Sequence, residues 1–406
     1  HDFVEAAFGA GAVGAIVAKP VSGAHVLVAD VTAALEALAR AARDRCGGKI
    51  VGVTGSVGKT STKEALFAAL ERNAPGLVHR SVKSYNNHTG VPLSLARMPR
   101  DSLFAVLEMG MNNAGEIAAL TRQVRPHVAL VTAIAPAHIE NLGSEEAIVD
   151  AKGEIFEGLE GEAIAIVPDT TPHRDRLVRA ARRHAERTIS FGCDDSDVHA
   201  IHAVPADGGG SLITAALLER ELTFTISQRG QHWVTNALAV LAAVEALGAD
   251  VAIAGLALAD MGGIKGRGER HRIAVEGGEL LLIDESYNAN PASMAATLKS
   301  FGEERDVTRR IAVLGAMREL GEQSPALHAS LAPAVLGAKV DRLIAVGDEM
   351  EPLITALGGA VDVCRADSVE DAADALLADA RAGDAVLVKA SNSIGLARLV
   401  ERITRR

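Results

Sequence analysis

Short apolar runs and longer amphipathic stretches alternate along the chain, and this alternation predicts a succession of strands and helices. Near the start, residues 15–18 and 26–29 form compact apolar runs that are typical of short strands. Residues 31–45 carry apolar positions at helical spacing, and Cys46-Gly47-Gly48 then breaks the pattern. We therefore interpret residues 1–46 as the remnant of a small α/β domain, too short to be a complete one.

A strand, a Gly-rich turn and a helix are predicted next, from Lys49 onward. The apolar run 50–53 is followed by the turn 54–59 and by a helical segment over 61–72. Three more buried-strand candidates, each followed by a helix-compatible segment, lie at 104–107, 128–132 and 163–167. Strands that alternate with helices indicate a parallel sheet covered on both faces.

The chain changes character after this first α/β region. Residues 198–226 contain short strands around a run of three glycines, which predicts an antiparallel edge, and a helix is predicted from about 232 to 247. Residues 262–268 form the most linker-like stretch of the chain. A second rhythm of strands follows, at 280–284, 311–314, 342–346, 361–364 and 385–388.

This pattern predicts an α/β protein with a central domain over 47–272 and a second doubly wound, Rossmann-like domain over 273–406. Neither an internal repeat nor a low-complexity tract interrupts it.

Composition narrows the class of protein. The sequence contains no run of about 18 apolar residues, so no membrane-spanning helix is predicted. Three scattered cysteines without CxxC spacing favour a reducing compartment over a disulfide or zinc framework. The net charge of −11 disfavours a nucleic-acid binder. The first residues carry neither an initiator Met nor a basic targeting region, so we expect the chain to start inside a longer protein and to be cytoplasmic.

Candidate chemistry begins at the turn 54–61, whose sequence is Thr-Gly-Ser-Val-Gly-Lys-Thr-Ser. Glycines that let backbone N–H groups curl around phosphate, followed by a helix N-terminus, are typical of a phosphate-binding loop. In such a loop Lys59 reaches the β- and γ-phosphates and the Thr60 hydroxyl ligates Mg²⁺. Val53 stands where the standard spacing has a small residue, with Gly52 one position earlier, so the loop is a variant. The alternative is a tight strand–helix turn in another α/β domain.

Glu108 ends the predicted strand 104–107. A carboxylate at the carboxyl end of a neighbouring parallel strand is well placed to be a second Mg²⁺ ligand. The alternative is a helix-capping or solvated acid.

Seven ordered motifs together resemble the Mur ligases of bacterial cell-wall synthesis. They are GVTGSVGKTSTK at 52–63, NNHTGVPLSL at 86–95, EMG at 108–110, AHIENLGS at 137–144, AKGEIF at 151–156, DESYNANP at 284–291 and LGAMRELGEQS at 314–324. The Tyr-Asn-Ala-Asn-Pro and Asn-Asn-x-x-Gly-Val-Pro-Leu elements point to the family member that adds D-alanyl-D-alanine. The resemblance implies a UDP-binding N-terminal domain, a central ATPase domain and a C-terminal Rossmann-like domain.

The resemblance also implies an ATP-dependent amide ligase that activates a carboxylate as an acyl phosphate. Its substrates are then UDP-MurNAc-tripeptide and D-Ala-D-Ala, its cofactor is Mg²⁺, and a monomer is expected. Lys59, His138 and Lys152 are the implied catalytic residues, with Lys152 carrying CO₂ as a carbamate. The implied metal ligands are Thr60, Glu108, His138 and the carbamate on Lys152.

Binding roles follow from the same resemblance. ATP is implied to contact Thr54, Gly55, Ser56, Val57, Gly58, Lys59, Thr60, Ser61, Asn236, Arg267 and Asn288. The other substrates are implied to contact Asn86, Asn87, Tyr287, Asn290, Ser324 and His328. Arg270 is an alternative to Arg267 as the arginine that reaches the phosphates.

One departure and three alternatives stay open. The family pattern Val-Lys-Gly-Ser-Arg reads Val-Lys-Ala-Ser-Asn at 388–392, so an arginine clamp for a carboxylate is missing there. A sibling Mur ligase or a folylpolyglutamate-type synthetase is the nearest alternative. A P-loop switch or kinase is another, although the chain lacks a guanine-specifying Asn-Lys-x-Asp. The third is a chain that binds nucleotide without the UDP-substrate.

Overall fold

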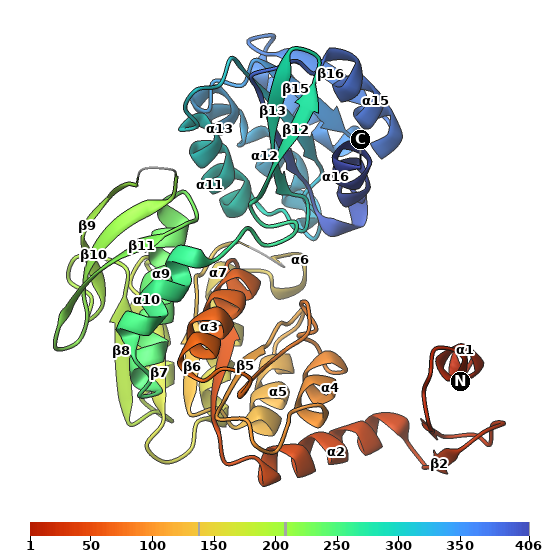
Figure 1. The fold of residues 1–406 in the computed structure, drawn as a ribbon, viewed down its shortest axis with the longest axis vertical. Coiled ribbons are helices and arrows are strands. Elements are labelled where there is room, and N and C mark those ends of the chain that lie inside the picture. The colour runs from red at the N-terminus through yellow and green to blue at the C-terminus, as the bar shows by residue number, and fades with distance from the viewer. Residues whose placement is uncertain (137–138, 207–208, 406) are drawn as a thin grey trace.

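The computed structural model describes residues 1–136, 139–206 and 209–405. Two six-stranded sheets dominate it, joined by a short linker, and a three-stranded sheet and a two-stranded pair complete the architecture (Figure 1). This α/β arrangement confirms the predicted fold class.

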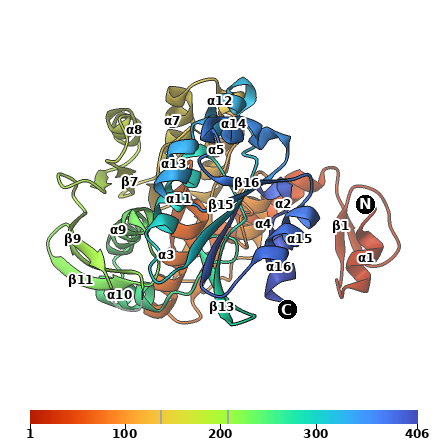
Figure 2. The ribbon, with the colours of Figure 1, turned by 90° about the horizontal axis from the view of Figure 1, so that it is seen from above.

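The N-terminal segment is a small unit joined to the rest by one helix. Its elements are α1 (Val4–Gly9), β1 (Ala15–Val17), β2 (His25–Leu27) and α2 (Val31–Arg45). The two strands pair in parallel. Figures 1 and 2 show α1 and the strands on one side of the molecule, away from the three-stranded sheet.

Helix α2 packs on the central region, although the sequence placed it with the N-terminal remnant. The Asp30 side chain accepts the Ala33 N–H and so caps the helix. Ala39 is buried in the same cluster as Ile50, and the Arg43 Nε donates to the Val124 carbonyl at 2.8 Å.

The central sheet is wholly parallel, with strand order β4-β5-β3-β6-β7-β8. Its strands are β3 (Lys49–Thr54), β4 (Val78–Arg80), β5 (Phe104–Glu108), β6 (Val128–Val131), β7 (Ile164–Pro168) and β8 (Arg187–Phe191). Strand β3 is flanked by β5 and β6, which are reached by connections in opposite directions. In such sheets ligands bind at the carboxyl ends of the strands where the direction changes.

Helices cover both faces of this sheet. They are α3 (Lys59–Asn73), α4 (Gly90–Ala96), α5 (Glu116–Val124), α6 (Ile139–Leu142), α7 (Glu145–Gly153), the 3₁₀ helix η1 (Glu154–Gly158), α8 (Arg174–Ala181), α9 (Gln231–Ala246) and α10 (Val251–Asp260). One apolar cluster lies under α3, α9 and α10, and a second under α2, α4, α5, α7 and α8. The continuous apolar strands of the sequence are therefore buried on both sides, as predicted.

The antiparallel edge predicted over 198–226 is confirmed as a separate sheet. It consists of β9 (His199–Pro205), β10 (Ser211–Ala216) and β11 (Glu221–Ile226), all antiparallel. Phe224 of β11 belongs to the same buried cluster as α9 and α10.

The second large sheet has the order β12-β13-β17-β14-β15-β16. Its strands are β12 (Glu269–Val275), β13 (Gly278–Glu285), β14 (Arg309–Gly315), β15 (Arg342–Val346), β16 (Asp362–Ala366) and β17 (Asp384–Lys389). All neighbours are parallel except the β12–β13 hairpin. The antiparallel β12 was not predicted, and it crosses position 272/273, where the sequence placed the start of the last domain.

Helices again lie on both faces, α11 and α13 on one and α15 and α16 on the other (Figure 1). The helices of this region are α11 (Pro291–Gly302), η2 (Gly321–Gln323), α12 (Ser324–Ala329), α13 (Ala332–Gly337), η3 (Asp348–Met350), α14 (Glu351–Leu357), α15 (Val369–Asp379), η4 (Asn392–Ile394) and α16 (Ala397–Thr404). Across the described residues, every helix is too short or too polar to cross a membrane.

Candidate active site

The loop between β3 and α3 has the strand–turn–helix context that the sequence predicted. Gly55 and Gly58 have φ values of +148° and +83°, in the region that favours glycine. A Cβ atom on Gly55 would lie 2.1 Å from Thr132 Oγ1. Thr132 itself donates its hydroxyl to the Val57 carbonyl at 2.6 Å. The loop is therefore held in a curled conformation from the end of the neighbouring strand.

Lys59 begins α3 and points back over this loop. Its ammonium donates to the Gly55 carbonyl at 2.6 Å. Burial lowers the pKa of Lys59; Arg267 lowers it further, and Glu108 opposes the shift. The loop thus presents a partly desolvated cation whose charged form an anionic ligand such as phosphate would stabilise.

Glu108 lies at the end of β5, one strand from the loop, and is 1% exposed. The Thr60 hydroxyl donates to its Oε2 atom at 2.9 Å, and Asn86 Nδ2 donates to its Oε1 atom at 2.8 Å. Ser84 Oγ lies 3.0 Å from Thr60 Oγ1. A hydroxyl and a carboxylate thus meet beside Lys59, and oxygen atoms of this kind are the ligands that Mg²⁺ prefers.

Lys152, in α7, is completely buried. Its Nζ atom has no hydrogen-bond partner among the described residues. Burial holds the pKa of Lys152 well below its usual value, and the nearby charge of Lys59 lowers it further, while Glu154 and Glu116 act in the opposite direction. Burial therefore favours the uncharged amine, which is the form that reacts with CO₂. The other predicted member of this group, His138, lies outside the described residues.

A cavity of about 680 Å³ opens between the central region and the last region. Its walls bring together most of the predicted site residues: Ser56, Val57, Gly58, Lys59, Thr60, Ser61, Asn86, Asn87, Glu108, Asn236, Arg267, Tyr287, Asn288 and Asn290. Five predicted site residues do not line this cavity: Thr54, Gly55, Lys152, Ser324 and His328. The volume is within the range of small-molecule sites.

Asn236 reaches the phosphate loop from α9. A Cβ atom on Gly58 would lie 3.0 Å from Asn236 Oδ1, so the amide stands directly against the loop. Trp233, one turn earlier in α9, also lines the cavity. Asn236, which the sequence resemblance implied as an ATP contact, therefore faces the cavity.

Arg267 enters the cavity from the linker, and Arg270 does not. The Arg267 guanidinium carbon lies 4.3 Å from the centre of the Tyr287 ring. Arg270 instead donates to both carboxylate oxygens of Glu304, at 2.8 and 2.7 Å. Glu304 also pairs with Arg229 of the central region. This arrangement supports Arg267 as the arginine that faces bound phosphate.

Three predicted asparagines also shape the backbone around the cavity. The Asn290 side chain accepts the Ser293 N–H at 2.9 Å and caps α11. Asn87 Oδ1 accepts the Gly90 N–H at 2.9 Å, at the start of α4. The Asn288 carbonyl accepts from Lys389 Nζ at 2.9 Å. The side chains of Asn87 and Asn290 thus stabilise local turns, and both residues also line the cavity.

Ser324 and His328 lie away from the cavity, in α12. His328 is fully buried; its Nε2 atom accepts the Met317 N–H at 3.0 Å, and its Nδ1 atom donates to the Ser324 carbonyl at 2.8 Å. Burial lowers the pKa of His328. Both ring nitrogens are engaged, so this geometry favours a role in holding the chain after β14.

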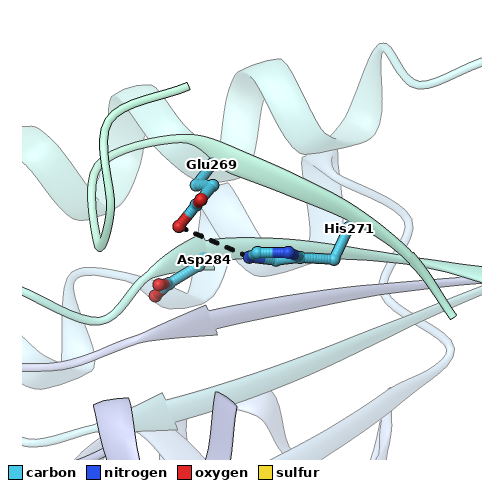
Figure 3. Close-up of side chains that lie close together, drawn as sticks. All are labelled: Glu269, His271 and Asp284. Atoms are coloured by element: carbon cyan, nitrogen blue, oxygen red, sulfur yellow. Dashed lines mark ion pairs between the residues drawn. The ribbon is translucent and has the colours of Figure 1, made fainter. Parts of the chain in front are cut away.

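A second group of possible metal ligands lies at the base of the linker. Glu269, His271 and Asp284 offer ligand atoms within 4.8 Å of one another (Figure 3). Asp284, however, accepts the Gly266 and Ser286 N–H groups, both at 3.0 Å, one on each carboxylate oxygen. Asp284 therefore braces the linker next to Arg267.

Sequence reasoning missed three residues that build the site: Thr132, Ser84 and Lys63. Thr132 follows a buried strand next to β3, a position that a strand-end rule could have identified. Ser84 and Lys63 act through contacts between distant segments, for which the sequence holds no local signal. The departure at 392 is placed at the site, because Asn392 lines the cavity.

A phosphate-binding loop that faces a Rossmann-like second sheet across an arginine-bearing linker defines an ATP-binding ligase. Residues 53–244 match the family model for the Mur ligase middle domain, and residues 266–392 match that for the Mur ligase glutamate ligase domain. The chain belongs to the Mur ligase family, whose members are ATP-dependent ligases.

Similar proteins and similar solved structures agree with this assignment to the Mur ligase family. The chain is 34% identical over 416 residues to the UDP-N-acetylmuramoyl-tripeptide–D-alanyl-D-alanine ligase of Synechocystis sp., covering 99% of this chain and 86% of that protein. The crystal structure of MurF from Acinetobacter baumannii matches with a TM-score of 0.86 at 29% identity, covering 100% of this chain and 88% of that one. MurF ligase from Thermotoga maritima in complex with ADP matches with a TM-score of 0.82 at 27% identity, covering 100% and 91%.

Proposed function

We propose that this chain joins D-Ala-D-Ala to UDP-MurNAc-tripeptide with hydrolysis of ATP to ADP and phosphate. The observation that supports this proposal best is the cavity of about 680 Å³, which has the phosphate loop on one wall and the segment from Tyr287 to Asn290 on the other. Two substrates held on opposite walls meet at the point that Lys59 and Arg267 face.

The first step joins two anions. A carboxylate oxygen of the tripeptide attacks the γ-phosphorus of ATP. The bond between this phosphorus and the oxygen that bridges the β- and γ-phosphates breaks. The products of this step are an acyl phosphate and ADP. Lys59 and Arg267 reduce the repulsion between the anions, since fixed cations stabilise charge that develops on a transferring phosphoryl group. The loop amides from Ser56 to Ser61 hold the phosphates at a helix N-terminus.

In the second step the neutral amine of the dipeptide attacks the acyl carbon. A tetrahedral intermediate forms, loses the amine proton, and expels phosphate to leave the amide. The chain contributes mainly position, because orientation of bound reactants lowers such barriers by about 7–11 kcal/mol. In this proposal Tyr287 and Asn290 orient the dipeptide, and Asn86 and Asn87 contact the muramyl-peptide.

Mg²⁺ fits the pair formed by Thr60 and Glu108, whose oxygens lie 2.9 Å apart in a buried setting beside Lys59. These two residues would hold the ion, which would supply positive charge against the phosphates. Asn236 would contact the adenine, and Asn288 the ribose.

A carbamate fits Lys152, because its buried amine lacks a hydrogen-bond partner among the described residues and has a lowered pKa. In this proposal CO₂ adds to the amine and converts it into an anionic oxygen ligand. His138 is the proposed companion ligand. Substrate contacts of Ser324 and His328 stay a prediction. The positions of these two residues do not favour it, because neither residue lines the cavity.

The proposed domain organisation follows the sheets. Residues 1–46 belong to a UDP-binding domain and 47 onward to the ATPase domain. The ligase domain begins at Glu269, where β12 starts, rather than at 273. We propose a cytoplasmic monomer that acts on small molecules.

The test is phosphate release by the purified chain with ATP, Mg²⁺ and UDP-MurNAc-tripeptide. Release should depend on D-Ala-D-Ala and should not occur with diaminopimelate, L-lysine or glutamate as the acceptor. A preference for one of these amino acids would support the sibling or folylpolyglutamate-type alternative. Release without any acceptor would instead support a nucleotide switch and contradict the proposal.

A further inference from the structure

Lys63 is the second lysine of α3, one turn beyond Lys59, and unlike Lys59 it does not line the cavity. It is completely buried. A buried ammonium is costly unless oxygen atoms surround it. Lys63 Nζ has four such oxygen partners from three parts of the chain. These oxygens stabilise the buried charge and join α3 to the ends of β4 and β5.

Two of these partners are backbone carbonyls of the segment that follows β4. Lys63 Nζ donates to the Ser81 carbonyl at 3.2 Å and, at closer range, to the Lys83 carbonyl. Lys83 has a φ of +51°, a left-handed conformation that is strained for a non-glycine residue. The ammonium is therefore bonded to the strained residue of the segment.

The segment held in this way carries residues of the site. Ser84 lies directly after Lys83, and its Oγ atom is 3.0 Å from Thr60 Oγ1. Asn86 follows and donates to Glu108 at 2.8 Å. A change in the Lys83 backbone would thus move two side chains that face the cavity.

The remaining two partners are acids. Glu64 Oε1 lies 2.9 Å from Lys63 Nζ and Glu108 Oε2 lies 3.8 Å from it. This Oε2 atom is the one that also accepts from Thr60. The ammonium thus places a positive charge beside the carboxylate oxygen that also accepts from Thr60.

We propose that Lys63 is a positioning residue for the metal ligand Glu108 and for the segment 81–87. It acts through these groups and touches no substrate. The inference rests on the proposed function only in taking Thr60 and Glu108 as the holders of Mg²⁺. Lys63 then sets how well that pair takes up the ion, while Lys59 binds the nucleotide itself.

The experiment compares Lys63→Met and Lys63→Arg with Leu70→Ala. Leu70 is a fully buried residue of the same helix that contributes only to the apolar core, so its truncation lowers stability without touching the site. Trp233, the single tryptophan of the chain, lines the cavity, so its fluorescence is expected to change when ADP binds. ADP is titrated without metal and then at increasing Mg²⁺.

Lys63→Met should bind metal-free ADP within about two-fold of the parent but need at least about ten-fold more Mg²⁺ to reach the metal-bound state. Its amides over 81–87 should exchange hydrogen faster. Lys63→Arg, which keeps the charge and the donors, should restore part of both properties. Leu70→Ala should match the parent in both. A Lys63→Met variant that differs from the parent only in melting temperature, as Leu70→Ala does, would overturn the proposal.

Lys63→Met removes the ion-pair partner of the buried Glu108 and so risks unfolding. The double variant Lys63→Met/Glu108→Gln removes both charges, and its exchange over 81–87 should still be faster than that of Glu108→Gln alone. Equal exchange in these two variants would also overturn the proposal. Neither readout needs turnover, so an inactive parent would count against the proposed function and not against the role of Lys63.

Discussion

The guanidinium of Arg267 lies over the face of the Tyr287 ring, with 4.3 Å between its central carbon and the ring centre. The Tyr287 N–H donates to the Gly266 carbonyl at 3.1 Å, so backbone and side chain join the linker to the loop after β13. The Arg267 charge is near enough to lower the pKa of Lys59. A cation on the linker and a cation on the phosphate loop therefore face one cavity, and closing the linker would bring both against the same anion.

Replacing Arg267 by Ala should lower kcat by roughly 10²-fold, as expected when one fixed donor to a transferring phosphoryl group is lost. The free energy of unfolding should change by no more than about 1 kcal/mol, since a partly exposed cation–π contact contributes about that much. Steady-state phosphate release and thermal melting measure the two effects. Arg267→Lys should recover only part of the rate, because an ammonium lacks the planar fork.

Arg270→Ala is the matched control, three residues along the chain. Glu304 is 5% exposed and would keep only Arg229 as its partner. We expect a loss of roughly 1–3 kcal/mol in the free energy of unfolding, with nucleotide affinity retained. If Arg270→Ala instead removed turnover and left stability unchanged, the roles of the two arginines would have to be exchanged.

Lys59→Met should abolish detectable turnover and weaken ADP binding, because the loop would lose its only side-chain cation while its amides remain. Titration of Trp233 fluorescence measures the affinity. Lys49→Met provides the comparison: Lys49 is at the opposite end of β3, where its ammonium donates to the Leu247 carbonyl at 2.9 Å. Turnover close to that of the parent in Lys59→Met would remove the basis for assigning phosphate binding to this loop.

His328→Ala should cost roughly 1–3 kcal/mol of stability, because the Met317 N–H is left buried without an acceptor. The pH dependence follows from the lowered pKa of His328. Its contribution is fully present above the unfolded value of about 6.5 and is lost as the pH falls through the lower folded-state pKa, by at most about 1.4 kcal/mol per pH unit. Melting curves between pH 5 and 8, compared for parent and variant, measure this loss.

The same variant tests the substrate role that the motif implied. His328 does not line the cavity, so the KM for D-Ala-D-Ala should stay within about two-fold of the parent when the assay temperature is well below the melting point. A selective rise in that KM, without a loss of stability, would place His328 among the substrate contacts after all.

The phosphate loop and Glu108 could be located from sequence because each depends on local rules. A buried strand, two glycines and a Gly-Lys-Thr ending define the loop, and the acid at a parallel strand end must lie at the same edge of the sheet. The antiparallel β12 escaped prediction because Glu269 to Arg272 are all polar or charged, and a strand at a sheet edge needs no apolar run. Its pairing with β13 depends on the hairpin, which buries only one side of it.

The environment of a side chain was harder to predict than its element. His328 stands in a motif next to site residues, yet helical spacing alone does not reveal that its ring faces the interior. Lys63 follows Lys59 by one turn of α3. Its ammonium is bound by backbone carbonyls only because the parallel sheet places the segment 81–83 next to α3. Such contacts join segments that are distant in sequence, so they required the structure.

Lys152→Met should separate stability from activity. Because burial holds the folded-state pKa of Lys152 well below the unfolded value of about 10.4, the unfolded chain binds this proton more tightly than the native chain does. The burial of this amine thus destabilises the parent below that unfolded value, and the penalty shrinks as the pH rises toward it. In CO₂-free buffer the melting temperature of Lys152→Met should therefore be higher than that of the parent at pH 7, and the difference should close toward pH 10.

Lys152→Met should also be inactive, whereas Lys152→Glu, which supplies a carboxylate, should retain more turnover than Lys152→Met. Parent activity that falls when CO₂ is stripped and returns with bicarbonate would support the carbamate. Activity indifferent to both, with Lys152→Glu no better than Lys152→Met, would contradict it.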